Sequence, residues 1–127
     1  MTKNIATVLG IIFIIVGLAG FAMPGMMGMH LTVAHNVIHL ASGALALYYG
    51  LKGSPAAARS FCTVFGAIYA LVGLIGFAVG GPDRMFTVIP NQLVLGTMDH
   101  ILHSILGVVL LFAGLYKKPV MAGPPVP

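Results

Sequence analysis

Charge is the property that this sequence has least of. Only 6% of its 127 residues are charged, and just two side chains are acidic. About a quarter of the residues of a soluble domain carry a charge, so this chain has too few charged side chains to cover a surface that faces water. Its outer face must therefore meet lipid, and the hydrophobic residues, which make up 59% of the chain, supply that face. The length suits a single membrane domain, residues 1–127.

Two other scarcities exclude further classes of protein. The only cysteine is Cys62, so there is no internal disulfide framework and no cysteine pair that would bind zinc. The six basic residues are scattered at the ends of apolar runs, which excludes nucleic acid as a partner despite a net charge of +4. The chain also lacks a nucleotide-binding loop and a serine-nucleophile motif, and we favour a protein that is not an enzyme.

Long apolar runs take the place of charge. A membrane helix needs roughly 20 predominantly apolar residues, and four runs meet this need: residues 5–23, 31–51, 61–79 and 95–116. Links that contain proline and glycine separate the runs. Residues 88–92, with Pro90-Asn91, predict a re-entrant or interfacial turn, and residues 119–127 predict a short proline-rich tail. The predicted fold class is all-α, a bundle of four transmembrane helices.

The basic residues also predict how this bundle is oriented. One side of a four-pass arrangement receives Lys3, Lys52, Arg59, Lys117 and Lys118, whereas the other side receives only Arg84. Loops rich in lysine and arginine stay in the cytoplasm. We therefore expect a multi-pass protein of the bacterial inner (plasma) membrane, with both termini cytoplasmic.

An internal duplication is visible in the first and third runs. Residues 8–25 read VLGIIFIIVGLAGFAMPG, and residues 64–81 read VFGAIYALVGLIGFAVGG, so ten of the eighteen positions are identical. The shared positions include three glycines in each copy, and small residues of this kind let membrane helices approach closely. Each copy is thus expected to pack against a following helix in the same way.

The second and fourth runs align as well, with His39 over His103. We place repeat 1 at about residues 5–52 and repeat 2 at about 61–117. Each repeat starts inside, crosses and returns, so the chain is predicted to be two parallel helical hairpins. A pseudo-two-fold axis along the membrane normal would relate them.

Four ionisable side chains interrupt the second and fourth runs: His35, His39, Asp99 and His103. The members of each pair are four residues apart and share one helix face. Ionisable groups inside membrane helices are costly and usually face the interior of the bundle. Imidazole and carboxylate groups suit a divalent metal such as Zn, Fe or Mn, and Asn36 and His100 are candidates for the residues that orient the ligands.

Two other interpretations of these four residues remain open. His39 and His103 would be suitable ligands for a haem or another pigment bound between them. Alternatively the residues bind nothing, and Asp99 accepts hydrogen bonds from His39 or His103 in a buried polar network. Histidine and asparagine do join membrane helices in this way.

A methionine-rich loop follows the first run and contains Met23, Met26, Met27, Met29 and His30. Thioethers beside a histidine suit Cu(I). Methionine is also a flexible apolar filler, and the corresponding residues 79–82 of the second repeat have no methionine cluster. We therefore favour a packing role for this loop over a copper site.

Several of these segments are similar to a known family. The resemblance rests on residues 65–76, on 88–91, on the HNxxH pattern of residues 35–39 and on the DxxxH pattern of residues 99–103. These resemble an uncharacterised family of small bacterial four-helix membrane proteins, labelled only as a domain of unknown function. The resemblance covers roughly residues 9–115 and implies a four-pass bundle with His35, Asn36, His39, Asp99 and His103 in its pattern. It implies no activity.

These observations favour a small non-enzymatic accessory or scaffold subunit with a buried His/Asp cluster in the outer half of the bilayer. Its partners would be lipid and either a larger membrane complex or a second copy of the chain. The alternative is a metal- or haem-binding membrane protein with a redox or metal-handling role.

Overall fold

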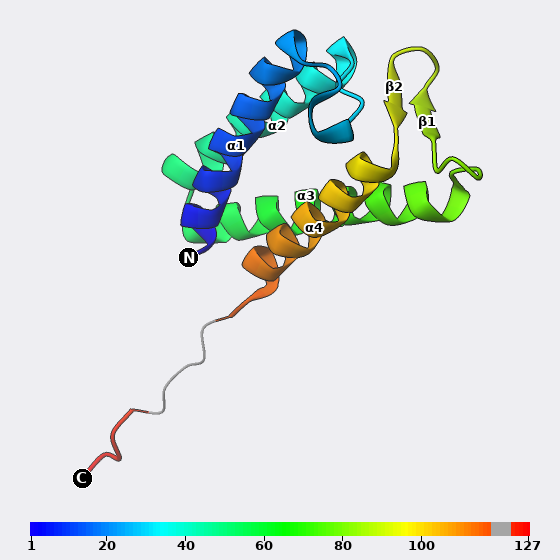
Figure 1. Cartoon of the computed structure of the whole chain (residues 1–127). Helices are drawn as coiled ribbons and strands as arrows, with labels where there is room; N and C mark the ends of the chain where they lie inside the picture. Colours follow the sequence, from blue (N-terminus) through cyan, green and yellow to red (C-terminus); the bar gives the residue numbers. More distant parts are fainter. Residues whose placement is uncertain (118–122) are drawn as a thin grey trace.

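The computed structural model describes residues 1–117 and 123–127, and these residues form four α-helices (Figure 1). The helices are α1 (Thr2–Ala22), α2 (Val33–Leu51), α3 (Pro55–Val79) and α4 (Thr97–Leu115). A short 3-10 helix, η1 (Met26–Gly28), lies between α1 and α2. The all-α prediction with four helices is confirmed. Lys118 and residues 119–122 of the predicted tail lie outside the described residues.

Local sequence explains where two of the helices begin. The hydroxyl of Thr32 accepts a hydrogen bond from the backbone N–H of His35 (3.3 Å) at the start of α2. The hydroxyl of Ser54 accepts one from Ala57 (3.1 Å) at the start of α3, where Pro55 is the first helical residue. Such caps satisfy N–H groups that have no partner inside the helix. The cap at Thr32 therefore places His35 in the first turn of α2.

Three helices in the described part of the chain, α1, α3 and α4, are long and apolar enough to cross a membrane. The chain is therefore a membrane protein. The remaining predicted run corresponds to α2, which has 19 residues and hence sufficient length but is not among these three helices. Its polar residues His35, Asn36 and His39 lower its apolarity, and counting the length of the run alone overlooked this.

The helices pack as two pairs, α1 with α2 and α3 with α4, and each pair is in closer contact than the pairs are with each other (Figure 1). Glycines allow this close packing. A Cβ added to Gly10 of α1 would lie 3.0 Å from the carbonyl oxygen of Gly43 in α2. One added to Gly66 of α3 would lie 3.0 Å from the carbonyl oxygen of Gly107 in α4. The same backbone-to-backbone contact thus occurs in both pairs.

Small and aromatic side chains join the two pairs. Phe13 of α1 and Tyr69 of α3 occupy equivalent positions of the duplicated segments, and their ring centroids are 5.3 Å apart. Near the N-terminus, the hydroxyl of Thr2 donates to the carbonyl of Ala113 in α4 (2.8 Å). These contacts connect the pairs in their middle and at the end that holds the N-terminus.

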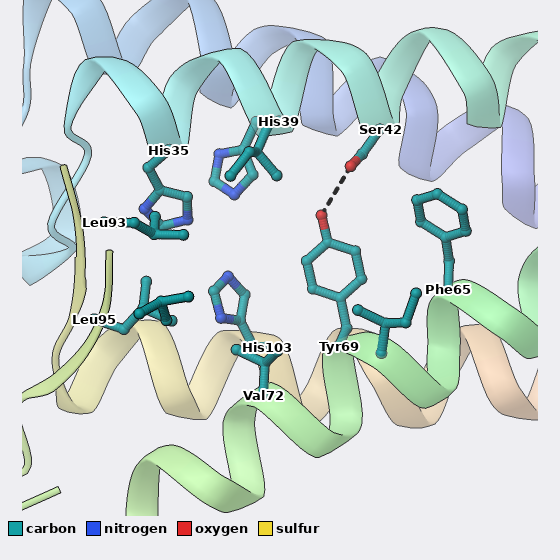
Figure 2. A pocket seen from close by; sticks show the side chains of 12 residues that line it. His35, His39, Ser42, Phe65, Tyr69, Val72, Leu93, Leu95 and His103 are labelled. Atoms are coloured by element: carbon teal, nitrogen blue, oxygen red, sulfur yellow. Dashed lines mark hydrogen bonds between the residues drawn. The ribbon is translucent and has the colours of Figure 1, made fainter. Parts of the chain in front are cut away.

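A β-hairpin occupies the link between α3 and α4, where the sequence predicted only a turn. Strands β1 (Phe86–Ile89) and β2 (Leu93–Leu95) pair in an antiparallel manner. The turn contains Asn91, whose φ of 60° lies in the left-handed region that asparagine tolerates. On β2, Leu93 and Leu95 are buried and point toward the helices (Figure 2). The hairpin therefore covers one end of the space between the helix pairs.

Candidate histidine site

Three histidine side chains meet between the helix pairs, and we call them the histidine cluster: His35 and His39 of α2 and His103 of α4 (Figure 2). Each ring offers a nitrogen, and these nitrogens lie within 4.8 Å of one another. All three side chains are buried. The structure thus brings together three of the four ionisable residues that the sequence singled out.

Helix geometry explains how the rings come to face a common space. His35 and His39 are one turn apart on α2, and their ring centroids are 4.2 Å apart. His103 approaches from α4, with its centroid 5.5 Å from that of His35 and 6.3 Å from that of His39. Figure 2 shows the three imidazoles turned toward one another across the gap between the pairs.

One of the three rings is held by the backbone. Nδ1 of His35 lies 2.9 Å from the carbonyl oxygen of His30. A carbonyl can only accept, so Nδ1 carries the proton and donates it to this bond. Nε2 of His35 therefore keeps its lone pair, which is the form of imidazole that binds a metal ion.

The other two rings have unpartnered nitrogens. Nδ1 of His39 and Nδ1 of His103 are buried and have no hydrogen-bond partner among the described residues. Leaving such a group unpaired costs about 1–3 kcal/mol, so an unpaired buried nitrogen needs an explanation. The described residues therefore leave a buried nitrogen unpaired on each of these two rings.

Asp99 lies apart from the histidine cluster, although the sequence predicted that it would join it. Its carboxylate accepts hydrogen bonds from the backbone N–H of Gly96 (2.8 Å) and of His30 (3.2 Å). It also accepts one from Nδ1 of His30 (3.1 Å). Asp99 is in the first turn of α4, where unpaired N–H groups attract a carboxylate. It accepts from neither His39 nor His103, so the predicted network between those three residues is not the one observed.

Asn36 and His100 do not orient the histidine cluster either. Asn36 donates to the carbonyl of Leu31 (3.3 Å), and Nε2 of His100 donates to the carbonyl of Arg84 (2.6 Å). Each side chain packs on a glycine of the adjacent helix, Gly20 for Asn36 and Gly76 for His100. Their shared role is to fill the space that a missing side chain leaves in each helix pair.

His30 takes the orienting role that was predicted for those residues. Its backbone N–H and ring bind Asp99, and its carbonyl accepts from His35. Sequence reasoning assigned His30 only to a copper loop. One feature of the sequence could have indicated a partner such as His30. Asp99 lies in the first turn of a helix, and a carboxylate buried there requires donors from another segment.

The methionine-rich loop is not organised around His30 as a copper ligand, because the ring of His30 is bound to Asp99. Met23 and Met27 are exposed, Met26 is half-buried and Met29 is buried. Met27 adopts a left-handed φ of 56°. The loop brings Met27 and Met29 to the wall of a cavity beside His39 rather than around His30.

Two apolar cavities flank the histidine cluster. The first, of about 250 Å³, lies between α2, α3 and the hairpin, and all three histidines line it (Figure 2). The second, of about 310 Å³, lies between α1 and α4 and is lined by His39 and His103. The rings of His39 and His103 therefore stand between two spaces whose walls are otherwise almost wholly apolar.

The fold and the site define a small membrane protein with a buried cluster of imidazoles. Residues 3–116 match the family described as a domain of unknown function (DUF4383), and the chain belongs to this family. The resemblance noted from the sequence is thereby confirmed. No curated protein and no solved structure matches the chain.

Proposed function

We propose that this membrane protein binds one transition-metal ion at its histidine cluster. The observation that carries the proposal is the convergence of three buried imidazoles from two helix pairs, with their nitrogens within 4.8 Å of one another. The burial of all three rings supports it, because a buried imidazole needs a partner for its nitrogens.

The donor set indicates which ions would bind. Three neutral imidazoles, with no carboxylate or thiolate among them, suit Zn²⁺ and also Cu, Fe and Ni. Zn–N bonds are about 2.0–2.1 Å long, so a tetrahedral ion needs nitrogens about 3.3 Å apart. The rings would have to close on the ion by small side-chain rotations. Three protein ligands leave a fourth position open, which distinguishes this arrangement from a closed structural site.

Haem fits the cluster less well than a single ion. A macrocycle ligated by His39 and His103 would need a flat slot between their rings. The ring of His35 lies 4.2 Å from one of these rings and 5.5 Å from the other, measured between centroids. It therefore occupies the region that the macrocycle would require.

We also propose that α2 is a fourth membrane span and that the chain is two parallel repeats about an axis along the membrane normal. The polar residues of α2 are turned inward, while Val33, Val37 and Leu45 are exposed on its outer face. Lipid would thus meet an apolar surface although the helix as a whole is less apolar. The recurring glycine contacts of the two pairs support the repeat.

The accessory role expected from the sequence fits a metal-holding subunit. Large apolar side chains such as Ile15, Leu18 and Val108 are more than half exposed along the helices. This surface suits lipid, and it equally suits a larger membrane complex or a second copy of the chain. In the proposed arrangement the protein lies in the bacterial inner membrane with both termini in the cytoplasm, and the cluster lies in the outer half of the bilayer.

Metal analysis of the purified protein tests the proposed function. The protein would carry a tag free of histidine, be incubated with excess Zn²⁺ in mild detergent, be desalted and be measured by mass spectrometry. We expect about one ion per chain for the parent. His103→Asn should lose the ion, because it removes one of three ligands.

A matched control is available on the same helix. His100 is also a buried histidine of α4, but it lies outside the cluster, and Asn36 already occupies the equivalent place in repeat 1. His100→Asn should therefore retain the ion. A parent without stoichiometric metal, or equal loss in both variants, would refute the metal site.

A further inference from the structure

The first cavity reaches the outer face of the protein. Ile38, Ile68 and Val88 line it and are 39%, 49% and 44% exposed. These residues come from α2, α3 and β1, so the opening lies between two helices and the hairpin. Because α2 and α3 are proposed to cross the membrane, the part of this opening between Ile38 and Ile68 would face lipid.

The few polar groups of this cavity lie in its inner part, away from the opening. The three imidazoles of the histidine cluster line it, together with Tyr69, whose hydroxyl donates to Ser42 (3.1 Å) (Figure 2). The remaining walls are apolar or aromatic and include Phe65, Val72, Leu93 and Leu95. An entering molecule would thus pass apolar side chains first and meet nitrogen and hydroxyl groups at the end. A few convergent polar groups in an apolar cavity are typical of a ligand site.

We propose that this cavity binds the ring of a lipid-soluble quinone. The ring oxygens would accept hydrogen bonds from an imidazole N–H of His39 or His103, and the ring would lie against Phe65 and Tyr69. The isoprenoid tail would leave between Ile38 and Ile68 into the lipid. The volume of about 250 Å³ is below the roughly 300–1,000 Å³ of drug-sized sites, which suits one substituted ring.

The lining argues against other lipids. A phospholipid headgroup carries a phosphate that requires cationic partners, and no lysine or arginine of the described residues lines this cavity. A quinone ring is uncharged, and its oxygens need only hydrogen-bond donors. The chemistry of the walls therefore matches a neutral ring with oxygen acceptors.

Quinone binding here rests on the proposed function in that it uses the same three histidines, but it does not require the ion. With an ion present, a ring oxygen would lie next to the open coordination position. Without an ion, the same oxygen would bond to an imidazole N–H. Metal content and quinone binding can therefore be measured separately on one sample.

The experiment titrates the purified protein in detergent with a benzoquinone that carries a ten-carbon chain, and it follows binding by calorimetry. Two matched variants locate the site, because Ile68 lines only the first cavity and Ile105 only the second, and both are exposed. We expect saturable binding by the parent. Ile68→Trp should weaken it by about tenfold or more, and Ile105→Trp should leave it nearly unchanged.

Each outcome decides the matter. Quinone binding in this cavity is overturned if the parent shows no saturable binding, or if the two tryptophan variants weaken binding equally. If those samples still retain metal, the proposed function stands. Selective weakening by Ile68→Trp in protein that holds no metal supports quinone binding while refuting the metal site.

Discussion

His35 differs from the other two histidines of the cluster because its orientation is set by a chain of hydrogen bonds that ends at a carboxylate. Asp99 binds the backbone and ring of His30, and the carbonyl of His30 accepts from His35. Partners of this kind hold a ligand ring in one orientation and one tautomer, and losing them typically weakens metal binding about 10–100-fold. Asp99 therefore acts on the cluster through His30, without contacting it.

Asp99→Asn tests this chain of contacts. The amide has one acceptor oxygen where the carboxylate has two, so it cannot serve the N–H of Gly96 and both groups of His30 equally well. We expect a loss of about 1–3 kcal/mol in the free energy of unfolding. We also expect zinc affinity to fall about tenfold or more, measured by titration in detergent.

Asp83 provides the control, because it is the other acidic residue of the chain and is exposed. Its carboxylate accepts from the N–H of Met85 within a turn. Asp83→Asn should change stability by less than about 0.5 kcal/mol and leave zinc affinity as it is. Equal zinc affinities for the two variants would show that Asp99 does not position His35.

At the scale of the elements, the close approach of the paired helices is the feature most sensitive to substitution. A Cβ on Gly107 of α4 would overlap the backbone of Ala70 in α3. Backbone atoms cannot move aside as the end of a flexible side chain can, so the two helices would have to separate.

Gly107→Ala should therefore destabilise the α3–α4 pair by about 1–3 kcal/mol. Thermal unfolding in detergent measures the effect. Gly25→Ala serves as the comparison, because a Cβ there meets nothing within 4 Å and Gly25 has a negative φ. If the two variants unfolded at the same temperature, the helices of the pair would not be held together at Gly107.

The elements also show what the sequence could and could not predict. Apolar runs, the duplicated glycines and the four-residue spacing of His35 and His39 are local patterns, and they correctly indicated the four helices and a face that turns inward. The partner of Asp99 is His30, which is 69 positions away, and no periodicity connects a loop to a helix start. The hairpin escaped detection because its short strands resemble one apolar run interrupted by a turn.

At the scale of the whole molecule, the uneven distribution of basic residues predicts which ends face the cytoplasm. Labelling of single cysteines tests this orientation in a Cys62→Ala background. Ala56 lies near the start of α3 and Gln92 lies in the hairpin turn, and both are exposed. A maleimide that cannot cross membranes should label Gln92→Cys in intact cells, and should label Ala56→Cys only after permeabilisation.

The reverse labelling pattern would place the termini outside and the histidine cluster in the inner half of the bilayer. Labelling of both cysteines in intact cells would show that the segment between them, which includes all of α3 after its first turn, does not cross the membrane. We expect neither result, because α3 is by itself long and apolar enough to cross the membrane.

The position of the hairpin also affects how fast a bound ion could leave the histidine cluster. Leu93 and Leu95 lie over the end of the cavity that holds the histidine cluster, and they shield a group bound beneath them from water at that end. A chelator dissolved in the aqueous phase would have to wait for these two leucines to swing away. Removal of a bound ion would then proceed at a rate set by the opening of the hairpin and would not increase with chelator concentration.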